Sequence, residues 1–233
     1  MGGSTPEPLA EGVFIVVPAH NEARVLRDVI AGLLPYSRNV VVIDDGSRDD
    51  TAAVARDAGA QVIRHLINRG QGAAIRTGMD FALSRGAKAI VTFDADGQHD
   101  PADLPAVVMP VLRGECDVVL GSRFHDHRSN VPWVRRLVLR GGIWFTRLVS
   151  GIKVTDTHNG FRAFSRRAAE MIEINQDQMA HASEILDEIA RRRLRYCEIA
   201  VRIRYNDYSQ QKGQSSLASL RIVWDFLFEK LRR

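Results

Sequence analysis

Short runs of apolar residues, rich in valine and isoleucine, recur through the first half of the chain, and longer stretches with helical spacing separate them. Apolar runs of this length that end in turn residues are typical of buried strands. The predicted strands cover residues 13–17, 40–43, 61–65, 89–93 and 118–120. The predicted helices cover residues 22–34, 49–58 with Asp49 or Asp50 as the cap, 72–84, and a stretch that begins near Pro101. This alternation predicts an α/β fold with a mostly parallel sheet flanked by helices.

The second half of the chain is less regular. Residues 131–150 interleave apolar and arginine positions, which predicts two amphipathic helices broken at Gly141 and Gly142. Residues 155–162 predict a structured loop, residues 182–193 a helix and residues 198–205 a strand. We expect a flexible N-terminus over residues 1–11 and a C-terminal amphipathic helix over residues 215–233.

Polar clusters follow four of the predicted strands. They are Pro18–Glu22, Asp44–Ser47, Asp94–Gln98 and Gly121–Arg123. Because the carboxyl ends of parallel strands meet at one edge of a sheet, these clusters are expected where ligands bind in open α/β sheets.

Asp94 and Asp96 are the most informative pair in these clusters. Their side chains are expected on the same side of an extended segment, because side chains alternate with a period of two. Two carboxylates placed in this way repel each other unless a cation lies between them, and oxygen ligands suit Mg²⁺ or Mn²⁺. The alternative is a solvated turn, since Asp, Gly and Pro all favour turns.

Composition narrows the functional classes. A chain of 233 residues can build one substantial core. The net charge is +4, with arginines concentrated in residues 123–147 and 191–204. Such regions suit nucleic acid, an anionic membrane or a phosphorylated substrate. No nucleic-acid-binding signature accompanies them, so we expect no nucleic acid partner. No G-x-G-x-x-G follows the first predicted strand and no P-loop motif occurs, which argues against dinucleotide-binding proteins and P-loop nucleotidases.

The remaining features concern the cell compartment. Cys116 and Cys197 lack metal-ligand spacing and are interpreted as buried thiols in a reducing compartment. We find no signal peptide and no apolar run of about 18 residues. We therefore expect a cytoplasmic protein, either free or peripheral on the inner face of the cell membrane.

Six motifs occur in a fixed order along the chain. They are Val17–Glu22, Ile43–Thr51, Asn68–Gly72, Phe93–Pro101, Gly121–Phe124 and Asp156–Arg162. Over roughly residues 12–212 they resemble the family-2 glycosyltransferases with the GT-A (Rossmann-like) fold. The likeness is greatest to the branch of polyprenyl-phosphate (dolichol-phosphate) mannosyl- and glucosyltransferases. The resemblance implies a single GT-A domain over residues 12–214, with a nucleotide-sugar half (12–122) and an acceptor half (123–214).

The implied reaction is a metal-dependent transfer of a sugar, with inversion, from a UDP- or GDP-sugar to a polyprenyl phosphate at the membrane surface. No residue decides between the two bases, although we lean towards uridine. The resemblance implies an enzyme of the hexosyltransferase type.

The resemblance also assigns residues to the donor and the metal. The expected contacts of the donor nucleotide are Pro18, Ala19, Asn21, Glu22, Asp45, Ser47, Asn68, Gly72, Asp94, Ala95, Asp96 and Lys212. Asp94, Asp96 and Gln98 match the ligands of a divalent cation, Mg²⁺ or Mn²⁺, which would act as a Lewis acid. The glycine-rich start of the helix after Asn68 would also suit an anion, or it forms a plain strand-to-helix turn.

Acceptor residues follow from the same resemblance. Arg123 and Arg135 match positions that contact the acceptor phosphate, which suits the guanidinium fork. Glu184 is our preferred general base and Asp156 is its rival. A phosphate acceptor is already anionic and needs little base catalysis, in which case either acid would mainly position other groups.

Alternatives remain at this point. The chain could be a soluble family-2 transferase that acts on a sugar or small-molecule hydroxyl, or a non-catalytic nucleotide-sugar-binding subunit. The C-terminal amphipathic stretch could lie on an anionic membrane, pack on the domain or bind a membrane-protein partner.

Overall fold

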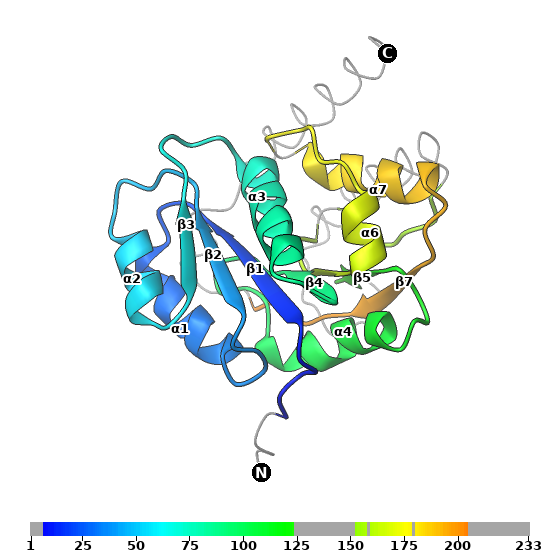
Figure 1. Cartoon of the computed structure of the whole chain (residues 1–233), viewed down its shortest axis with the longest axis horizontal. Helices are drawn as coiled ribbons and strands as arrows, with labels where there is room; N and C mark the ends of the chain where they lie inside the picture. The colour runs from blue at the N-terminus through cyan, green and yellow to red at the C-terminus, as the bar shows by residue number, and fades with distance from the viewer. Residues whose placement is uncertain (1–6, 124–151, 158, 179, 205–233) are drawn as a thin grey trace.

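A seven-stranded sheet lies between two layers of helices in the computed structural model of the chain, which describes residues 7–123, 152–157, 159–178 and 180–204 (Figure 1). The strands are β1 (Val13–Ala19), β2 (Val40–Asp44), β3 (Gln61–Arg64), β4 (Ala89–Thr92), β5 (Val118–Ser122), β6 (Arg162–Ser165) and β7 (Tyr196–Ala200). Their order across the sheet is β3-β2-β1-β4-β6-β5-β7, and only β6 pairs antiparallel to its neighbours. The predicted α/β fold with a mostly parallel sheet is confirmed.

Each face of the sheet is covered by its own set of helices (Figure 1). Helices α1 (Ala23–Leu33), α2 (Thr51–Asp57) and α4 (Leu104–Leu112) contribute to one core cluster, and a short 3₁₀ turn, η1 (Pro101–Asp103), precedes α4. Helices α3 (Gln71–Ser84), α6 (Arg166–Met171) and α7 (His181–Arg191) contribute to the other. The side chains of β1 alternate between the two clusters, with Ile15 and Val17 in the first and Phe14 and Val16 in the second.

The first strand runs on through Pro18, which was predicted to end it. Pairing of β1 with β4 stops at Val16 and Thr92, whereas pairing with β2 continues to Ala19. The N–H that proline lacks would point to the β4 side, beyond the last pair of that ladder, so no ladder hydrogen bond is lost.

The strand β6 and the helix α6 were not predicted. Strand β6 begins with a charged residue and has only four residues, so its own pattern is weak. Its stability comes from two neighbours, because Phe164 pairs with Ile90 of β4 and with Val118 of β5.

The last strand is shifted from its predicted position of 198–205. Strand β7 covers Tyr196–Ala200, and after it Ile203 forms an isolated bridge with His99. The alternating apolar residues in 199–203 are therefore divided between strand β7, which pairs with β5, and the bridge to His99.

Several expectations fall on residues outside the described ranges. These are the helix pair at 131–150, Arg135, Lys212 and the C-terminal helix at 215–233. Within the described part of the N-terminal segment, the Leu9 N–H donates to the Tyr36 carbonyl at 2.8 Å. No helix among the described residues is both long and apolar enough to cross a membrane.

Candidate active site at the carboxyl edge of the sheet

The loops after β1 and β2 are tied together at the carboxyl edge. The Ser47 Oγ accepts a hydrogen bond from the Asn21 N–H at 2.9 Å, and the Asn21 Oδ1 accepts one from the Arg48 N–H at 2.8 Å. Asn21 has φ = 55°, a left-handed conformation that asparagine tolerates better than most residues. The buried Asp44 accepts from the Ser47 N–H at 2.9 Å and pairs with Arg64 Nε at 3.1 Å. Two of the predicted donor residues, Asn21 and Ser47, are thus direct neighbours.

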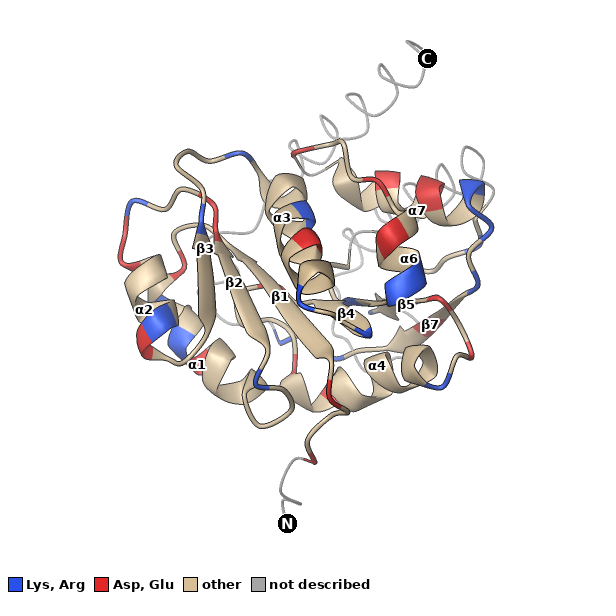
Figure 2. Ribbon diagram, in the orientation of Figure 1, with Lys and Arg blue, Asp and Glu red and all other residues tan. Residues whose placement is uncertain are grey.

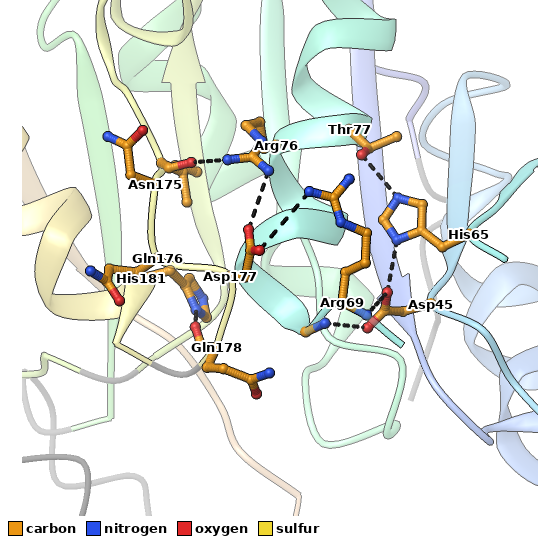
Figure 3. A network of polar contacts seen from close by, with 12 residues as sticks. Asp45, His65, Arg69, Arg76, Thr77, Asn175, Gln176, Asp177, Gln178 and His181 are labelled. Atoms are coloured by element: carbon orange, nitrogen blue, oxygen red, sulfur yellow. Dashed lines mark hydrogen bonds and ion pairs between the residues drawn. The ribbon is translucent and has the colours of Figure 1, made fainter. Parts of the chain in front are cut away.

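Asp45, a predicted donor contact, holds the loop between β3 and α3 (Figure 3). Its two carboxylate oxygens accept from the Arg69 N–H at 2.9 Å and the Gly70 N–H at 2.7 Å. His65 Nδ1 lies 2.7 Å from Asp45 Oδ1, and His65 Nε2 lies 3.0 Å from the Thr77 hydroxyl. The carboxylate is therefore engaged by protein groups, while its contact with a nucleotide stays a prediction.

Asp94 lies in a cage built by three separate segments. Gln71 Nε2, from the start of α3, donates to Asp94 Oδ1 at 3.0 Å, and His99 Nε2 lies 3.0 Å from Asp94 Oδ2. A side chain on Gly160 would come within 2.4 Å of both carboxylate oxygens, so only glycine fits there. Asp94 is thereby held in one orientation by residues from α3, from the turn after β4 and from the loop before β6.

The ring of His99 is buried and packs against two phenylalanines. Its centroid lies 5.4 Å from that of Phe93 and 5.2 Å from that of Phe161. The other ring nitrogen, Nδ1, has no hydrogen-bond partner among the described groups. The contact with Asp94 is therefore the polar contact that orients this ring.

Asp96 is the second acid of the pair. Burial, with added repulsion from Asp94 and Glu22, raises the pKa of Asp96 to about 6. Burial also acts to raise the pKa of Asp94, but the hydrogen bond from His99, with the charges of His99, His181 and Arg162, brings it below its usual value. The charged form of Asp96 is thus disfavoured, and a cation beside it would stabilise that form.

The residues present fit a divalent cation of the magnesium type. Asp94 and Asp96 offer oxygen ligands, and the Gln98 N–H, which donates to Asp96 Oδ1 at 3.0 Å, fixes the turn that carries Gln98. Within the described part of the chain, no group of three or more His, Cys, Asp and Glu side chains could hold a metal by itself. A cation here would need further ligands, and Mg²⁺ commonly takes these from substrate phosphates and water.

Arg123 and Asp156, which were predicted to act separately, form an ion pair. Arg123 Nε donates to Asp156 Oδ2 at 2.7 Å, and Nη2 donates to Oδ1 at 2.8 Å. The Asp156 side chain is almost fully buried. Because both carboxylate oxygens accept from one guanidinium, Asp156 is placed to orient Arg123 more readily than to take a proton.

Glu184 anchors an extended segment, residues 174–178, that crosses between α7 and α3. Its Oε2 accepts from the Asn175 N–H at 3.0 Å and from the Gln176 N–H at 2.8 Å. We find no hydrogen bond to Oε1 within the described residues. The role of Glu184 as a base stays a prediction.

The same segment closes the start of α3. The Asp177 carbonyl accepts from the Gly72 N–H at 2.9 Å and the Ala73 N–H at 3.4 Å, and a side chain on Gly72 would overlap the Gln176 carbonyl. Arg76 also holds the segment, because its Nη1 donates to the Ile174 carbonyl at 2.6 Å. Its Nη2 donates to Asp177 Oδ1 at 3.2 Å (Figure 3). These N–H groups of α3 therefore bind the protein itself, which favours the strand-to-helix turn over the expected anion site.

A buried arginine that the sequence did not single out links the loop before β6 to α7. Arg162 donates to the carbonyls of Asn159 at 3.0 Å, Thr157 at 3.2 Å and Ala182 at 3.4 Å. Burial lowers the pKa of Arg162 to about 10, although the carboxylates of Asp156 and Asp94 act in the opposite direction. It supplies positive charge between two acids of the site.

Four residues of the site carried no predicted role, namely Gln71, His99, Gly160 and Arg162. All four lie within motifs that the sequence displays, but the contacts of Gln71 and Gly160 with Asp94 join different motifs. Of the remaining predicted donor residues, Pro18, Ala19 and Glu22 lie at the end of β1 and the start of α1, Ala95 is buried between the two acids, and Asn68 is exposed on the loop before α3.

Several relatives are similar to this chain in sequence over most of its length. It is 37% identical over 224 residues to an uncharacterised protein of Methanocaldococcus jannaschii, which covers 94% of this chain and 92% of the relative. It is 28% identical to the UDP-N-acetylglucosamine–dolichyl-phosphate N-acetylglucosaminyltransferase of Methanococcus voltae, over 94% of this chain and 96% of that one. It is 30% identical to the polyprenol monophosphomannose synthase of Mycolicibacterium smegmatis, over 70% of this chain and 64% of that protein.

Solved structures agree with this assignment at the level of the fold. Glucosyl-3-phosphoglycerate synthase from Mycobacterium tuberculosis, in complex with Mn²⁺, UDP-glucose and phosphoglyceric acid, superposes with a TM-score of 0.69. The match covers 92% of this chain and 78% of that one at 23% identity, and it supports the expected GT-A fold. Residues 14–172 match the sequence profile described as Glycosyl transferase family 2. This profile match covers more than half of the chain, whose paired acids lie at the carboxyl edge of the sheet. The chain therefore belongs to the family-2 glycosyltransferases.

Proposed function

We propose that the protein transfers a sugar, with inversion, from a nucleotide-diphosphate sugar to a polyprenyl phosphate at a membrane surface, and that transfer requires Mg²⁺ or Mn²⁺. The observation that carries the proposal is the caged Asp94 beside Asp96, a pair of acids fixed at the ligand-binding edge of the sheet.

The comparisons support the choice of substrates. The relatives from Methanococcus and Mycolicibacterium are named for transfer to dolichyl phosphate and for a polyprenol monophosphomannose product. The structural neighbour was crystallised with Mn²⁺ and UDP-glucose. Both kinds of substrate carry phosphate groups, which suits paired acids that could hold a cation and an arginine such as Arg123.

On the donor side, Asp94, Asp96 and Gln98 would hold the cation. A bound cation would supply neutralisation of the charge that develops on the diphosphate leaving group. The chain's own contribution is orientation, because Gln71 and His99 each hold one oxygen of Asp94. A pre-oriented carboxylate needs little rearrangement when the donor binds.

On the acceptor side, Arg123 is the described residue best placed to contact a phosphate. Asp156 accepts from its Nε and Nη2, which fixes the plane of the guanidinium at the carboxyl edge. A phosphate acceptor arrives ionised, so no proton has to be removed before it attacks the anomeric carbon. Glu184 then acts as a structural anchor of residues 174–178, and its use as a base would matter only for a neutral acceptor.

Turnover of the purified full chain tests the proposal. The enzyme is incubated with UDP-glucose, UDP-N-acetylglucosamine or GDP-mannose, with Mn²⁺ or chelator, and with a polyprenyl phosphate or the matching polyprenol in detergent. We expect a glycosyl phospholipid by mass spectrometry from one donor, only with metal and only with the phosphate. Asp96→Asn should abolish the product and Asp57→Asn, an exposed acid on α2, should leave it unchanged. Product from the polyprenol alone, or metal-independent product, would contradict the proposal.

A further inference from the structure

The loop between β3 and α3 exposes two large apolar side chains. Leu66 is 100% exposed and Ile67 is 70% exposed, and no other large apolar side chain in the described part of the chain is exposed in this way. Transfer of each side chain out of water would lower the free energy, in proportion to the apolar area that is buried. An adjacent pair at the tip of one loop is therefore a candidate contact surface.

The loop presents this pair on a fixed backbone. Asp45 accepts from the N–H groups of Arg69 and Gly70, which fixes the end of the loop (Figure 3). At the tip, the backbone of Ile67 lies against Gly46, where a side chain would come within 2.5 Å of the Ile67 carbonyl carbon. These contacts fix the backbone at Ile67 and at the end of the loop.

The stretch of chain on either side of the pair is basic. Residues 61–79 contain three arginines and neither Asp nor Glu. Arg64 and Arg69 flank the pair, and their side chains are 55% and 46% exposed even though each approaches a carboxylate. Figure 2 shows blue at the end of β3 and again just before α3, with red at the neighbouring end of β2. Apolar side chains between cations suit the interface of an anionic bilayer, where the apolar groups enter the headgroup region and the cations meet lipid phosphates.

We propose that Leu66 and Ile67 insert into the headgroup region of an anionic bilayer and hold the carboxyl edge of the sheet at the membrane surface. The loop starts at the end of β3 and is tied through Asp45 to the end of β2, so it lies at the same edge as the candidate active site. The purpose of this contact rests on the proposed function, because a polyprenyl phosphate presents its phosphate at that surface. The contact itself is measured without any transfer reaction.

Co-sedimentation of the full chain with vesicles tests the proposal. The vesicles contain phosphatidylcholine alone or phosphatidylcholine with phosphatidylglycerol, and no polyprenyl phosphate. We expect the wild type to bind the anionic vesicles and the double variant Leu66→Ser, Ile67→Ser to lose at least about tenfold in partition coefficient. The matched double variant Leu66→Met, Ile67→Val keeps the apolar character and should bind like the wild type.

Two single arginine variants complete the design. Arg69→Gln should weaken binding to the anionic vesicles, whereas Arg113→Gln should not, because Arg113 is even more exposed than Arg69 but precedes β5 at the opposite edge. All of these side chains are exposed, so melting temperatures should stay within a few degrees and report on correct folding.

The outcomes separate this inference from the proposed function. Equal vesicle binding by the serine double variant and the wild type, or no binding by the wild type, would overturn the inference even if the enzyme glycosylates a lipid phosphate in detergent. Vesicle binding that depends on Leu66 and Ile67 would support it even if no lipid phosphate is glycosylated.

Discussion

The contact between His99 and Asp94 makes a sharp prediction, because it can be removed and restored by closely related side chains. The buried ring reaches Asp94 Oδ2 through Nε2 at 3.0 Å, while Nδ1 has no partner among the described groups. The amide nitrogen of glutamine can occupy the place of Nε2, whereas that of asparagine falls nearer the place of Nδ1. His99→Gln should therefore keep the contact and His99→Asn should lose it.

The expected magnitude follows from what the contact does. A hydrogen bond to a charged group contributes about 1.5–3 kcal/mol, and loss of a residue that orients a metal ligand typically lowers metal affinity about 10–100-fold. Since Gln71 still holds the other oxygen of Asp94, we expect an effect of about tenfold from His99→Asn. His99→Gln should stay within about threefold of the wild type.

The assay is a titration with Mn²⁺ at a fixed concentration of a nucleoside diphosphate. The melting temperature of the protein is measured at each Mn²⁺ concentration. The Mn²⁺ concentration at half-maximal stabilisation is compared among the wild type and the two variants. Melting without metal is the control for simple loss of packing against Phe93 and Phe161. The reasoning is refuted if both variants shift the Mn²⁺ midpoint equally, or if neither shifts it while both lose stability.

Other predictions concern the same cage and the framework around it. Gly160→Ala should impair Mn²⁺-dependent nucleotide binding, because the new methyl group would meet both oxygens of Asp94; unchanged binding would mean that the cage tolerates displacement. Gly78→Ala should destabilise the protein by about 1–3 kcal/mol in urea unfolding, since the methyl group would lie 2.2 Å from Val16 Cγ1, and an unchanged midpoint would contradict this packing. The hydrogen bond from Arg195 lowers the pKa of Asp117 despite burial, so its stabilisation is present above the unfolded pKa of about 3.9 and is lost as pH falls through the lower folded value. Urea unfolding from pH 6 to pH 3 should therefore show a smaller acid loss in Asp117→Asn, and identical pH profiles would argue against this pair.

The fold was largely predictable from the sequence because its central strands are buried on both faces. Runs such as Val40–Ile43 can only be buried, and the polar clusters that follow them mark one edge of the sheet. Strand β6 escaped prediction because four residues beginning with Arg162 carry no periodic signal, and their partners β4 and β5 supply the stability.

The sequence marked the acids of the candidate site, but it did not show which residues contact them. The spacing of Asp94 and Asp96 pointed to a pair of acids, and the structure places Asp96 beside Asp94 with a raised pKa. His99 reaches Asp94 from within the same turn, whereas the contact of Gln71 with Asp94 joins two segments that only tertiary folding brings together. The same holds for the pair of Arg123 with Asp156, which changes how both residues are interpreted.

The central claim is that Asp94 and Asp96 form a metal-dependent site for a nucleotide sugar. The most direct test is the thermal stability of the full chain with a panel of nucleoside diphosphates and nucleotide sugars, with Mn²⁺ or with chelator. We predict a rise in melting temperature for donors of one base, only with Mn²⁺, and its loss in Asp96→Asn. A cooperatively folded protein that no donor stabilises, or a rise that persists in chelator and in Asp96→Asn, would contradict the claim.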